Sequence, residues 1–215
     1  MQLRLKLHGF FNSSASYRVR IALELKGLAW QHVGVDIRSG EQETQQFKQI
    51  NPNGLVPVLE LDGKALGQSL AIIDRLDRLQ PDPLLIPADG IERDRVLEIA
   101  HLVACDMHPL NNLRVLKYLK DTLAIRDEQR NAWYAHWMEA GFRGLEALLP
   151  DHDGWCVGDS PTLADCCLVP QVANALRMRF DVAQFPRIQR VHAFCQAQPA
   201  FQRAAPGVQP DFLPA

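Results

Sequence analysis

Near its N-terminus the chain passes from an alternating apolar segment, through a turn rich in serine, into an amphipathic segment. Leu3, Leu5 and Leu7 would share one face of a strand, and residues 14–26 have the spacing of a helix. Residues 28–35, which follow a glycine suited to ending a helix, begin a second strand. A strand, a helix and a strand in this order predict an α/β domain at the start of the chain.

The serine-rich turn, Asn12-Ser13-Ser14-Ala15-Ser16, places hydroxyl groups where this helix begins. Serine side chains at a helix start accept hydrogen bonds from N–H groups that have no partner within the helix. The positive end of the helix dipole also favours a nearby anion. From the residues alone, capping of the helix is the simpler interpretation. The turn is nevertheless a candidate site for a thiolate or a carboxylate.

The following segments continue the alternation of strands and helices. A short polar helix is expected at 41–49, a hairpin near residue 62, and a further helix from Gln68 to residue 80. Pro57 lies inside an apolar run, so it must occupy a strand edge, a strand start or a special turn. The order β-α-β-α-β-β-α predicts one α/β domain over residues 1–80.

Beyond residue 80 the pattern changes. Residues 81–89 contain three prolines and are expected to form a linker, and the long apolar segments after them repeat with a helical period. An all-helical second domain is therefore predicted for residues 90–215, with an irregular tail from Pro206. The expected helices are 92–120, 126–149, 162–178, 186–196 and a short one near Ala200.

Composition excludes several kinds of partner. The 215 residues hold 23 basic and 25 acidic side chains, a formal charge of −2, without a basic run, so neither nucleic acid nor an anionic membrane is expected as a partner. Neither a membrane span nor a signal peptide is indicated, so a cytoplasmic protein is expected. The five cysteines lack metal-ligand spacing, so they are expected to be packing residues, and no metal site is expected.

Several motifs together resemble those of zeta-class glutathione transferases, the group that contains maleylacetoacetate and maleylpyruvate isomerases. The family pattern is Ser-Ser-Cys-Ser, an aromatic residue and Arg-Val-Arg-Ile-Ala-Leu, which this chain matches from Ser13 to Leu23 except for Ala15 in place of Cys. The resemblance implies a thioredoxin-like α/β N-terminal domain, an all-α C-terminal domain, a cis peptide bond before Pro57, and a homodimer. The further matches are Val56-Pro57, Gln68-Ser69, Thr162-Leu163-Ala164-Asp165 and Val169-Pro170-Gln171.

The same resemblance assigns residues to glutathione. Ser13 is carried over as the donor to the glutathione thiolate, with Ser14 beside it as a helper. Tyr17 is a weaker rival because it lies one turn inside the helix. Val56 would pair through its backbone with the cysteinyl part of glutathione. Two residues at the start of another helix would hold the γ-glutamyl carboxylate, namely Gln68 and Ser69.

Two further segments are implied to face glutathione or the substrate. The segment Asp-Met-His-Pro-Leu-Asn-Asn resembles one in the maleylpyruvate isomerase branch, which implies that His108 and Asn112 face the site. Arg177 aligns with the arginine that the family uses on a substrate carboxylate, a group that guanidinium geometry suits. The family often has an arginine just before its two serines, where this chain has Asn12, so one carboxylate contact is expected to be missing.

The function that the resemblance implies is glutathione-dependent cis–trans isomerisation of a maleyl-type 1,3-diketo acid, either maleylacetoacetate or maleylpyruvate, in the degradation of tyrosine or other aromatic compounds. The expected partners are glutathione, a small anionic substrate and a second copy of the chain. Two alternatives stay open. One is a transferase that acts on small α-halo acids with the same thiolate, and the other is a non-catalytic, transferase-like binding module.

Overall fold

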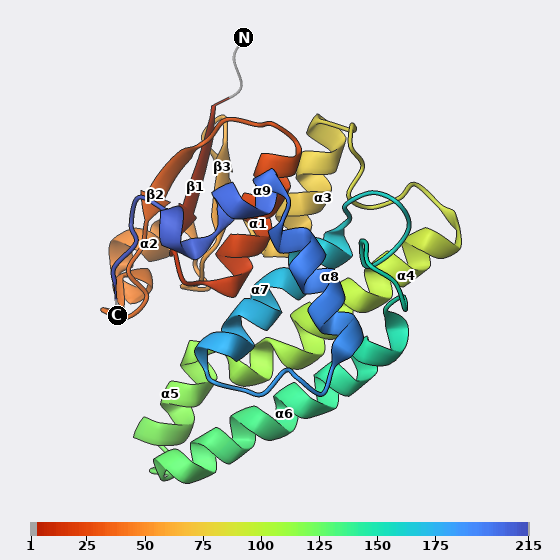
Figure 1. Ribbon diagram of the computed structural model, residues 1–215. Coiled ribbons are helices and arrows are strands. Elements are labelled where there is room, and N and C mark those ends of the chain that lie inside the picture. Colours follow the sequence, from red (N-terminus) through yellow and green to blue (C-terminus); the bar gives the residue numbers. More distant parts are fainter. Residues whose placement is uncertain (1–3, 215) are drawn as a thin grey trace.

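The computed structural model describes residues 4–214, so the expected place of Leu3 in the first strand lies outside the described residues. Within that range the first part of the chain forms a four-stranded sheet in the order β2-β1-β3-β4 (Figure 1). β1 pairs in parallel with β2, while β3 pairs antiparallel with both β1 and β4. The strands are β1 Leu5–Gly9, β2 Gln31–Gly34, β3 Val58–Leu61 and β4 Lys64–Gly67.

Helices cover both faces of this sheet, and the alternation of side chains along the strands explains their places. These helices are α1 Ser14–Leu25, α2 Gln45–Ile50, which follows a 3₁₀ turn at Glu41–Glu43, and α3 Ser69–Leu79. Leu7 and Leu59 are fully buried in the core that α1 and α3 complete. Val58, the neighbour of Leu59, packs instead with Phe47 of α2 on the other face. The thioredoxin-like order of elements is confirmed.

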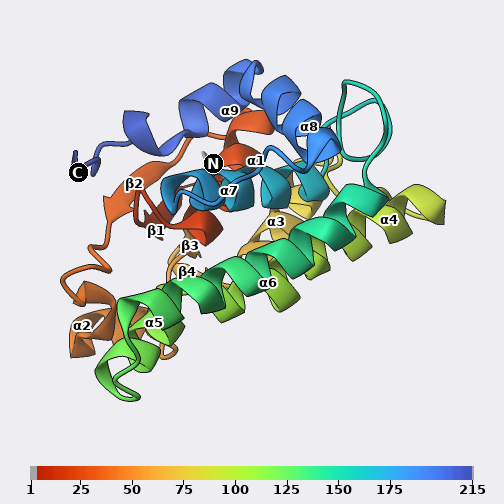
Figure 2. The same cartoon turned by 60° about the horizontal axis from the view of Figure 1, so that its bottom comes forward.

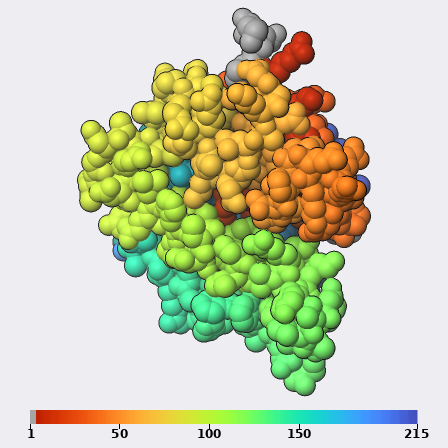
Figure 3. Space-filling model, turned by 180° about the vertical axis from the view of Figure 1, so that it is seen from behind, coloured from red at the N-terminus to blue at the C-terminus, as the bar shows by residue number. Residues whose placement is uncertain are grey.

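The second part of the chain is helical, as predicted. Its helices are α4 Gly90–His101, α5 Leu113–Asp121, α6 Asp127–Leu148, α7 Leu163–Arg177, α8 Pro186–Gln196 and α9 Pro199–Ala204. α7 lies at the centre and is buried along most of its length, because it packs against α1, α4 and α8 (Figures 1 and 2). Figure 3 shows the first domain, in orange and yellow, resting on the green region of α4 and α5.

The prediction of one helix over 92–120 is wrong. α4 passes into a π-helical turn, Leu102–Met107, and a 3₁₀ turn begins at Pro109. Proline has no N–H to contribute to the helical ladder, so the helix cannot continue through this position. A new helix, α5, begins after Asn112, whose Oδ1 accepts from the Arg114 N–H at 3.2 Å. The segment that contains the predicted site residues is therefore a break between two helices.

The start of α7 has the structural role that its sequence predicts. The buried carboxylate of Asp165 accepts from the backbone N–H of Thr162 at 2.8 Å and from its hydroxyl at 2.9 Å. It also accepts from the Cys156 N–H at 2.8 Å, which ties the preceding loop to the helix. These bonds serve the fold, since neither Thr162 nor Asp165 is among the residues that line the pocket described below.

The cysteines are free thiols, and their environments differ. Cys156, Cys166, Cys167 and Cys195 are buried, as expected for packing residues, and burial raises the pKa of the Cys167 thiol to about 11. Cys105 is exposed, so the expectation of a packing role is wrong there. No helix between residues 4 and 214 combines the length and the apolar character needed to cross a membrane.

Helix α1 belongs to both halves of the structure. One side of it completes the sheet core, and the other packs against α7 and α9. The hydroxyl of Ser14 donates to the carbonyl of Pro170 in α7 at 3.4 Å, which joins the first turn of α1 to the second domain. The serine-rich turn therefore lies at the junction between the domains.

Candidate active site

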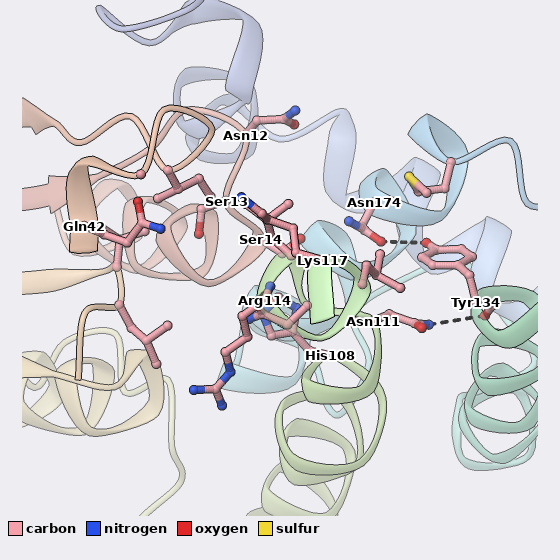
Figure 4. A pocket seen from close by; sticks show the side chains of 18 of the residues that line it. Asn12, Ser13, Ser14, Gln42, His108, Asn111, Arg114, Lys117, Tyr134 and Asn174 are labelled. Atoms are coloured by element: carbon pink, nitrogen blue, oxygen red, sulfur yellow. Dashed lines mark hydrogen bonds between the residues drawn. The ribbon is translucent and has the colours of Figure 1, made fainter. Parts of the chain in front are cut away.

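A pocket of about 640 Å³ opens between the two domains. The first domain contributes the serine-rich turn and two loops, and the second contributes the helix break, α5, α6 and the end of α7. Figure 4 shows Ser13 and Ser14 on one side of this pocket, with His108, Arg114 and Lys117 on the other. A volume of this size suits a small organic ligand of several functional groups. Ala15, the residue that replaces the family's cysteine, is not among the lining residues.

Ser13 is the N-cap of α1, and this role leaves its hydroxyl hydrogen free. Its Oγ accepts from the Ser16 N–H at 3.2 Å, while its own O–H has no acceptor within residues 4–214. The first turn of α1 carries no acidic side chain, so nothing there neutralises the positive end of the helix dipole. Capping and anion binding are therefore compatible at Ser13, which lines the pocket with a free donor.

The neighbouring hydroxyls have other partners. Ser14 lines the pocket, but its hydrogen is directed to the carbonyl of Pro170, so it is a weaker donor to a ligand than Ser13. Tyr17 is buried, and its hydroxyl donates to the Phe201 carbonyl at 3.4 Å. Tyr17 does not line the main pocket, although it lines a smaller one together with Ser13 and Ser14, so the preference for Ser13 over it stays a prediction.

His108 and Asn112 both line the pocket, at the break between α4 and α5. The Asn112 Nδ2 lies 3.4 Å from the His108 Nε2. Burial, together with the nearby positive charges of Arg18 and Arg114, lowers the pKa of His108 to about 3. His108 is therefore neutral near pH 7, and the contact with Asn112 assigns the ring hydrogen to Nδ1.

Arg177, the last residue of α7, reaches across to the serine-rich turn. Its Nη1 donates to the Asn12 carbonyl at 3.3 Å and contacts the Asn12 side-chain oxygen. Asn12 stands where the family often has an arginine. Its neutral side chain instead holds the guanidinium of Arg177 in place. Both residues line the pocket next to Ser13.

A polar group formed by Asn111, Tyr134 and Asn174 also lines the pocket, and it is not predicted from the sequence. The Tyr134 hydroxyl donates to the Asn174 Oδ1 at 2.6 Å, and the Asn111 Nδ2 donates to the Tyr134 carbonyl at 3.2 Å (Figure 4). Burial raises the pKa of Tyr134, so its hydroxyl stays neutral and can act as a donor. These residues come from three separate segments, and their spacing in the sequence gives no signal that they meet.

Cations on α5 and α6 were also not identified from the sequence. Arg114 and Lys117 lie three residues apart on α5 and form no ion pair with any residue between 4 and 214. Two further cations of the lining are paired with Asp127, Lys120 at 3.7 Å and Arg130 at 3.1 Å. The wall of the second domain therefore has two unpaired positive charges, in addition to Arg177, that can attract an anion.

Comparisons with known proteins agree with this geometry. The glutathione S-transferase N-terminal domain family matches residues 7–84, and the C-terminal domain family matches residues 126–197. A holo maleylpyruvate isomerase, described as a bacterial zeta-class glutathione S-transferase, superposes with a TM-score of 0.93 at 44% identity, over 97% of this chain and 100% of the other. The chain belongs to the zeta class of the glutathione S-transferases.

Other relatives of this zeta-class transferase carry related names. A probable maleylacetoacetate isomerase from Vibrio cholerae is 47% identical over 97% of this chain and 99% of the relative. A maleylacetoacetate isomerase from Methylobacterium extorquens, solved with bound malonate and glutathione, has a TM-score of 0.91 at 36% identity, over 98% of this chain and 100% of the other. The fold class and the family resemblance are thus both confirmed.

Not all of the residues that are predicted to bind glutathione in the first domain line the pocket. Val56 lines it, next to the Val56–Pro57 cis peptide bond and just before β3. Gln68 and Ser69, at the start of α3, are not among the lining residues. Gln68 is exposed with a positive φ of 67°, whereas Ser69 is buried. The pocket geometry therefore supports Val56 directly and leaves Gln68 and Ser69 as predictions.

Ser69 has a partner that the sequence analysis missed. The Nη1 of Arg18 donates to the Ser69 Oγ at 3.3 Å, and Arg18 is only 2% exposed. Its Nε and Nη2 have no hydrogen-bond partner among the described residues, and no carboxylate in residues 4–214 pairs with it. A buried guanidinium without a counter-charge is costly, so this region is suited to receive an anionic group beside Ser69.

Proposed function

We propose that this zeta-class transferase is a glutathione-dependent cis–trans isomerase of a maleyl-type 1,3-diketo acid such as maleylacetoacetate or maleylpyruvate. The observation that carries the proposal is that two groups line the same pocket. Ser13 offers a free hydroxyl donor at a helix N-terminus, and Arg177 offers a guanidinium group that can bind a carboxylate. The names of its near full-length relatives support the same reaction.

Glutathione fits the residues on the first-domain side. Ser13 offers a hydroxyl hydrogen, and Val56 lies at the pocket edge outside the sheet register, which leaves its backbone available to a peptide. The uncompensated charge of Arg18 beside Ser69 suits the α-carboxylate of the γ-glutamyl group. These features correspond to the thiol, the cysteinyl backbone and the γ-glutamyl end of the tripeptide.

When bound, glutathione supplies a thiolate that can add to a conjugated double bond and leave again after rotation about the resulting single bond. Ser13 stabilises the thiolate by donating a hydrogen bond, and the α1 N-terminus adds its positive potential. A free cysteine thiol has a pKa near 8.5, so these two effects set how much reactive anion is present at neutral pH.

The second domain holds the substrate. Arg177 binds a carboxylate next to the serine-rich turn, and Arg114 and Lys117 add positive charge farther along the pocket. The Asn174 amide nitrogen can donate to an oxygen on which negative charge develops, and the Tyr134 hydroxyl orients this amide by donating to the Asn174 Oδ1. His108 is neutral, so it orients Asn112 through its Nε2 and does not act as a cation.

The test is isomerisation of maleylacetoacetate and maleylpyruvate by the pure protein, each with and without glutathione, together with calorimetric measurement of glutathione binding. Turnover of at least one substrate only in the presence of glutathione is the expected result. Glutathione binding without turnover of either substrate would contradict the proposal and favour a small α-halo acid as the electrophile. Absence of glutathione binding would favour the non-catalytic binding module.

We also infer that the enzyme is a cytoplasmic homodimer, as the family resemblance implies. The mass in solution, measured by light scattering during size-exclusion chromatography, checks the oligomeric state, with twice the chain mass as the expected result. A single chain mass at enzyme-assay concentrations would contradict the dimer.

A further inference from the structure

The C-terminal segment returns to the first domain after α9. Figure 1 shows this blue segment ending beside β2, on the side of the molecule where β1 leads into α1. It contains the 3₁₀ turn Pro206–Val208 and is otherwise irregular, as predicted, but its contacts are specific. Asp211 in this segment lies 200 residues from its main partner, Phe11, in the turn that leads to Ser13.

Asp211 binds the backbone of the serine-rich turn directly. Its Oδ2 accepts from the Phe11 N–H at 2.9 Å, and its Oδ1 lies 2.9 Å from the His32 Nε2. The carboxylate is mostly enclosed, with 17% of the side chain exposed. Gly34 leaves the space that this contact needs, because a Cβ there would lie 3.0 Å from the Asp211 Cβ.

The opposite end of the same Phe11 residue is held by a buried cation. Arg20 is fully buried, and its Nη2 donates to the Phe11 carbonyl at 2.9 Å. Its Nε donates to the Ala204 carbonyl at 2.9 Å, which connects this arginine to α9. Phe11 is therefore held at its N–H by an anion and at its carbonyl by a cation, and charge-assisted hydrogen bonds are the stronger kind.

Phe11 lies two residues before Ser13, and Ser13 itself donates through its N–H to the Phe10 carbonyl at 3.0 Å. We propose that Asp211 is a positioning residue of the active site: by fixing Phe11, it sets the direction in which the Ser13 hydroxyl faces the pocket. The proposal rests on the proposed function, in which Ser13 donates to the glutathione thiolate. It makes the C-terminal segment part of the thiol-activating apparatus.

Other contacts also attach the C-terminal segment to the protein. A change at Asp211 therefore tests how Phe11 is positioned and not whether the segment stays attached. The Gln209 Nε2 donates to the carbonyls of Arg203 at 3.0 Å and Ala205 at 2.9 Å. The Phe212 ring packs edge-on against Phe11 with 5.3 Å between ring centres. None of these contacts uses the carboxylate of Asp211.

The experiment compares Asp211→Ala with Asp211→Asn, whose amide oxygen can still accept from the Phe11 N–H. The matched control is Asp153→Ala, an exposed carboxylate in the loop before α7. We expect Asp211→Ala to raise the amide exchange rate of the segment around Phe11 by about tenfold. It should lower the thiolate fraction of bound glutathione about threefold and kcat/KM about tenfold. Asp211→Asn should lie between Asp211→Ala and the wild type.

Unchanged amide exchange around Phe11 in Asp211→Ala, or faster exchange with an unchanged thiolate fraction, would overturn the proposal. Equal losses in Asp211→Ala and Asp153→Ala would also overturn it, since the effect would then not be specific to this contact. The exchange measurement requires neither glutathione nor turnover. A failure of the proposed isomerase activity in the wild type would therefore be distinguishable from a failure of the positioning role.

Discussion

The two walls of the pocket bind charge in different ways. On the first-domain wall the lining groups that face a ligand are neutral, namely the Ser13 hydroxyl and the Val56 backbone, and the acid there, Glu43, is paired with Lys48 at 2.8 Å. The unpaired charge of this domain, on Arg18, is buried beside Ser69 and does not line the pocket. The second-domain wall carries full positive charges on Arg177, Arg114 and Lys117. One wall therefore stabilises an anion by hydrogen bonds and a helix dipole, and the other by charged side chains.

The difference teaches which part of the chemistry depends on the fold. The position of the α1 N-terminus follows directly from the order of strand and helix. The fold itself therefore provides the helix dipole that activates the thiol. The cations lie on exposed positions of α5 and at the end of α7, where substitutions cost the fold little. Thiol activation and substrate selection should therefore respond to different mutations.

The largest expected effect is on the first-domain wall. Ser13→Gly removes the hydroxyl but keeps a residue that is tolerated at an N-cap, so stability should fall by only a few tenths of a kcal/mol. Loss of one donor to a developing or bound anion costs about 100-fold in kcat. Steady-state kinetics at saturating glutathione measure the loss of kcat, and ultraviolet titration of the bound thiol measures the loss of thiolate.

Ser13→Thr is the matched control, because threonine keeps both the cap and the hydroxyl. It should retain most of the activity. Wild-type kcat in Ser13→Gly would show that another group, and not Ser13, stabilises the thiolate.

The next largest effect is on the second-domain wall. Arg177→Met should raise the KM for an anionic substrate about 10-fold or more, since a hydrogen-bonded charge contact contributes about 1.5–3 kcal/mol. The pKa of bound glutathione should change little, because the Arg177 guanidinium is directed to the oxygens of Asn12 and not to the Ser13 hydroxyl. Substrate kinetics and thiol titration on the same variant check that substrate binding and thiol activation depend on different residues. A large shift of the thiol pKa would contradict this.

A smaller effect is expected on α5. Lys117→Met should raise KM about threefold, because Lys117 is exposed and solvent screens its charge. The matched control is Lys120→Met, since Lys120 lies one turn away and is already paired with Asp127 at 3.7 Å. Kinetics at low and high salt measure the difference. Equal changes in both variants would contradict a specific role for the unpaired charge.

The smallest effect on activity is expected from His108, whose influence is on stability in acid. Its pKa is lowered from 6.5 to about 3 in the folded protein, so the unfolded chain binds its proton first as the pH falls. Stability should therefore decline as the pH falls from about 6.5 toward 3. His108→Asn should flatten this decline in urea unfolding measured across that range. An unchanged slope would contradict the assigned burial of a neutral histidine.

Much of the fold could be predicted from local pattern. The change from alternating to helical periodicity separates the two kinds of structure, and the serine-rich turn marks the start of α1. Pro109 signalled an interruption, but periodicity alone extended one helix across it, since the apolar spacing resumes on the other side. Local sequence rules do not predict that a π-helical turn and a 3₁₀ turn connect the two helices at this break.

The site could be predicted only where its residues are close in sequence or match a family motif. Ser13, His108, Asn112 and Arg177 were found in this way, and the structure brings them to one pocket. The bond from Arg177 to Asn12 joins residues 165 apart. Such contacts depend on how α7 packs on α1, and periodicity contains no information about that packing.

The most direct test of the account compares glutathione with S-methylglutathione, which keeps the peptide groups but has no free thiol. Initial rates of maleylpyruvate and maleylacetoacetate isomerisation should be measured with each at concentrations that saturate binding. The account predicts turnover with glutathione and none with S-methylglutathione, although both bind. Equal rates with the two compounds would contradict a mechanism based on the thiolate at Ser13.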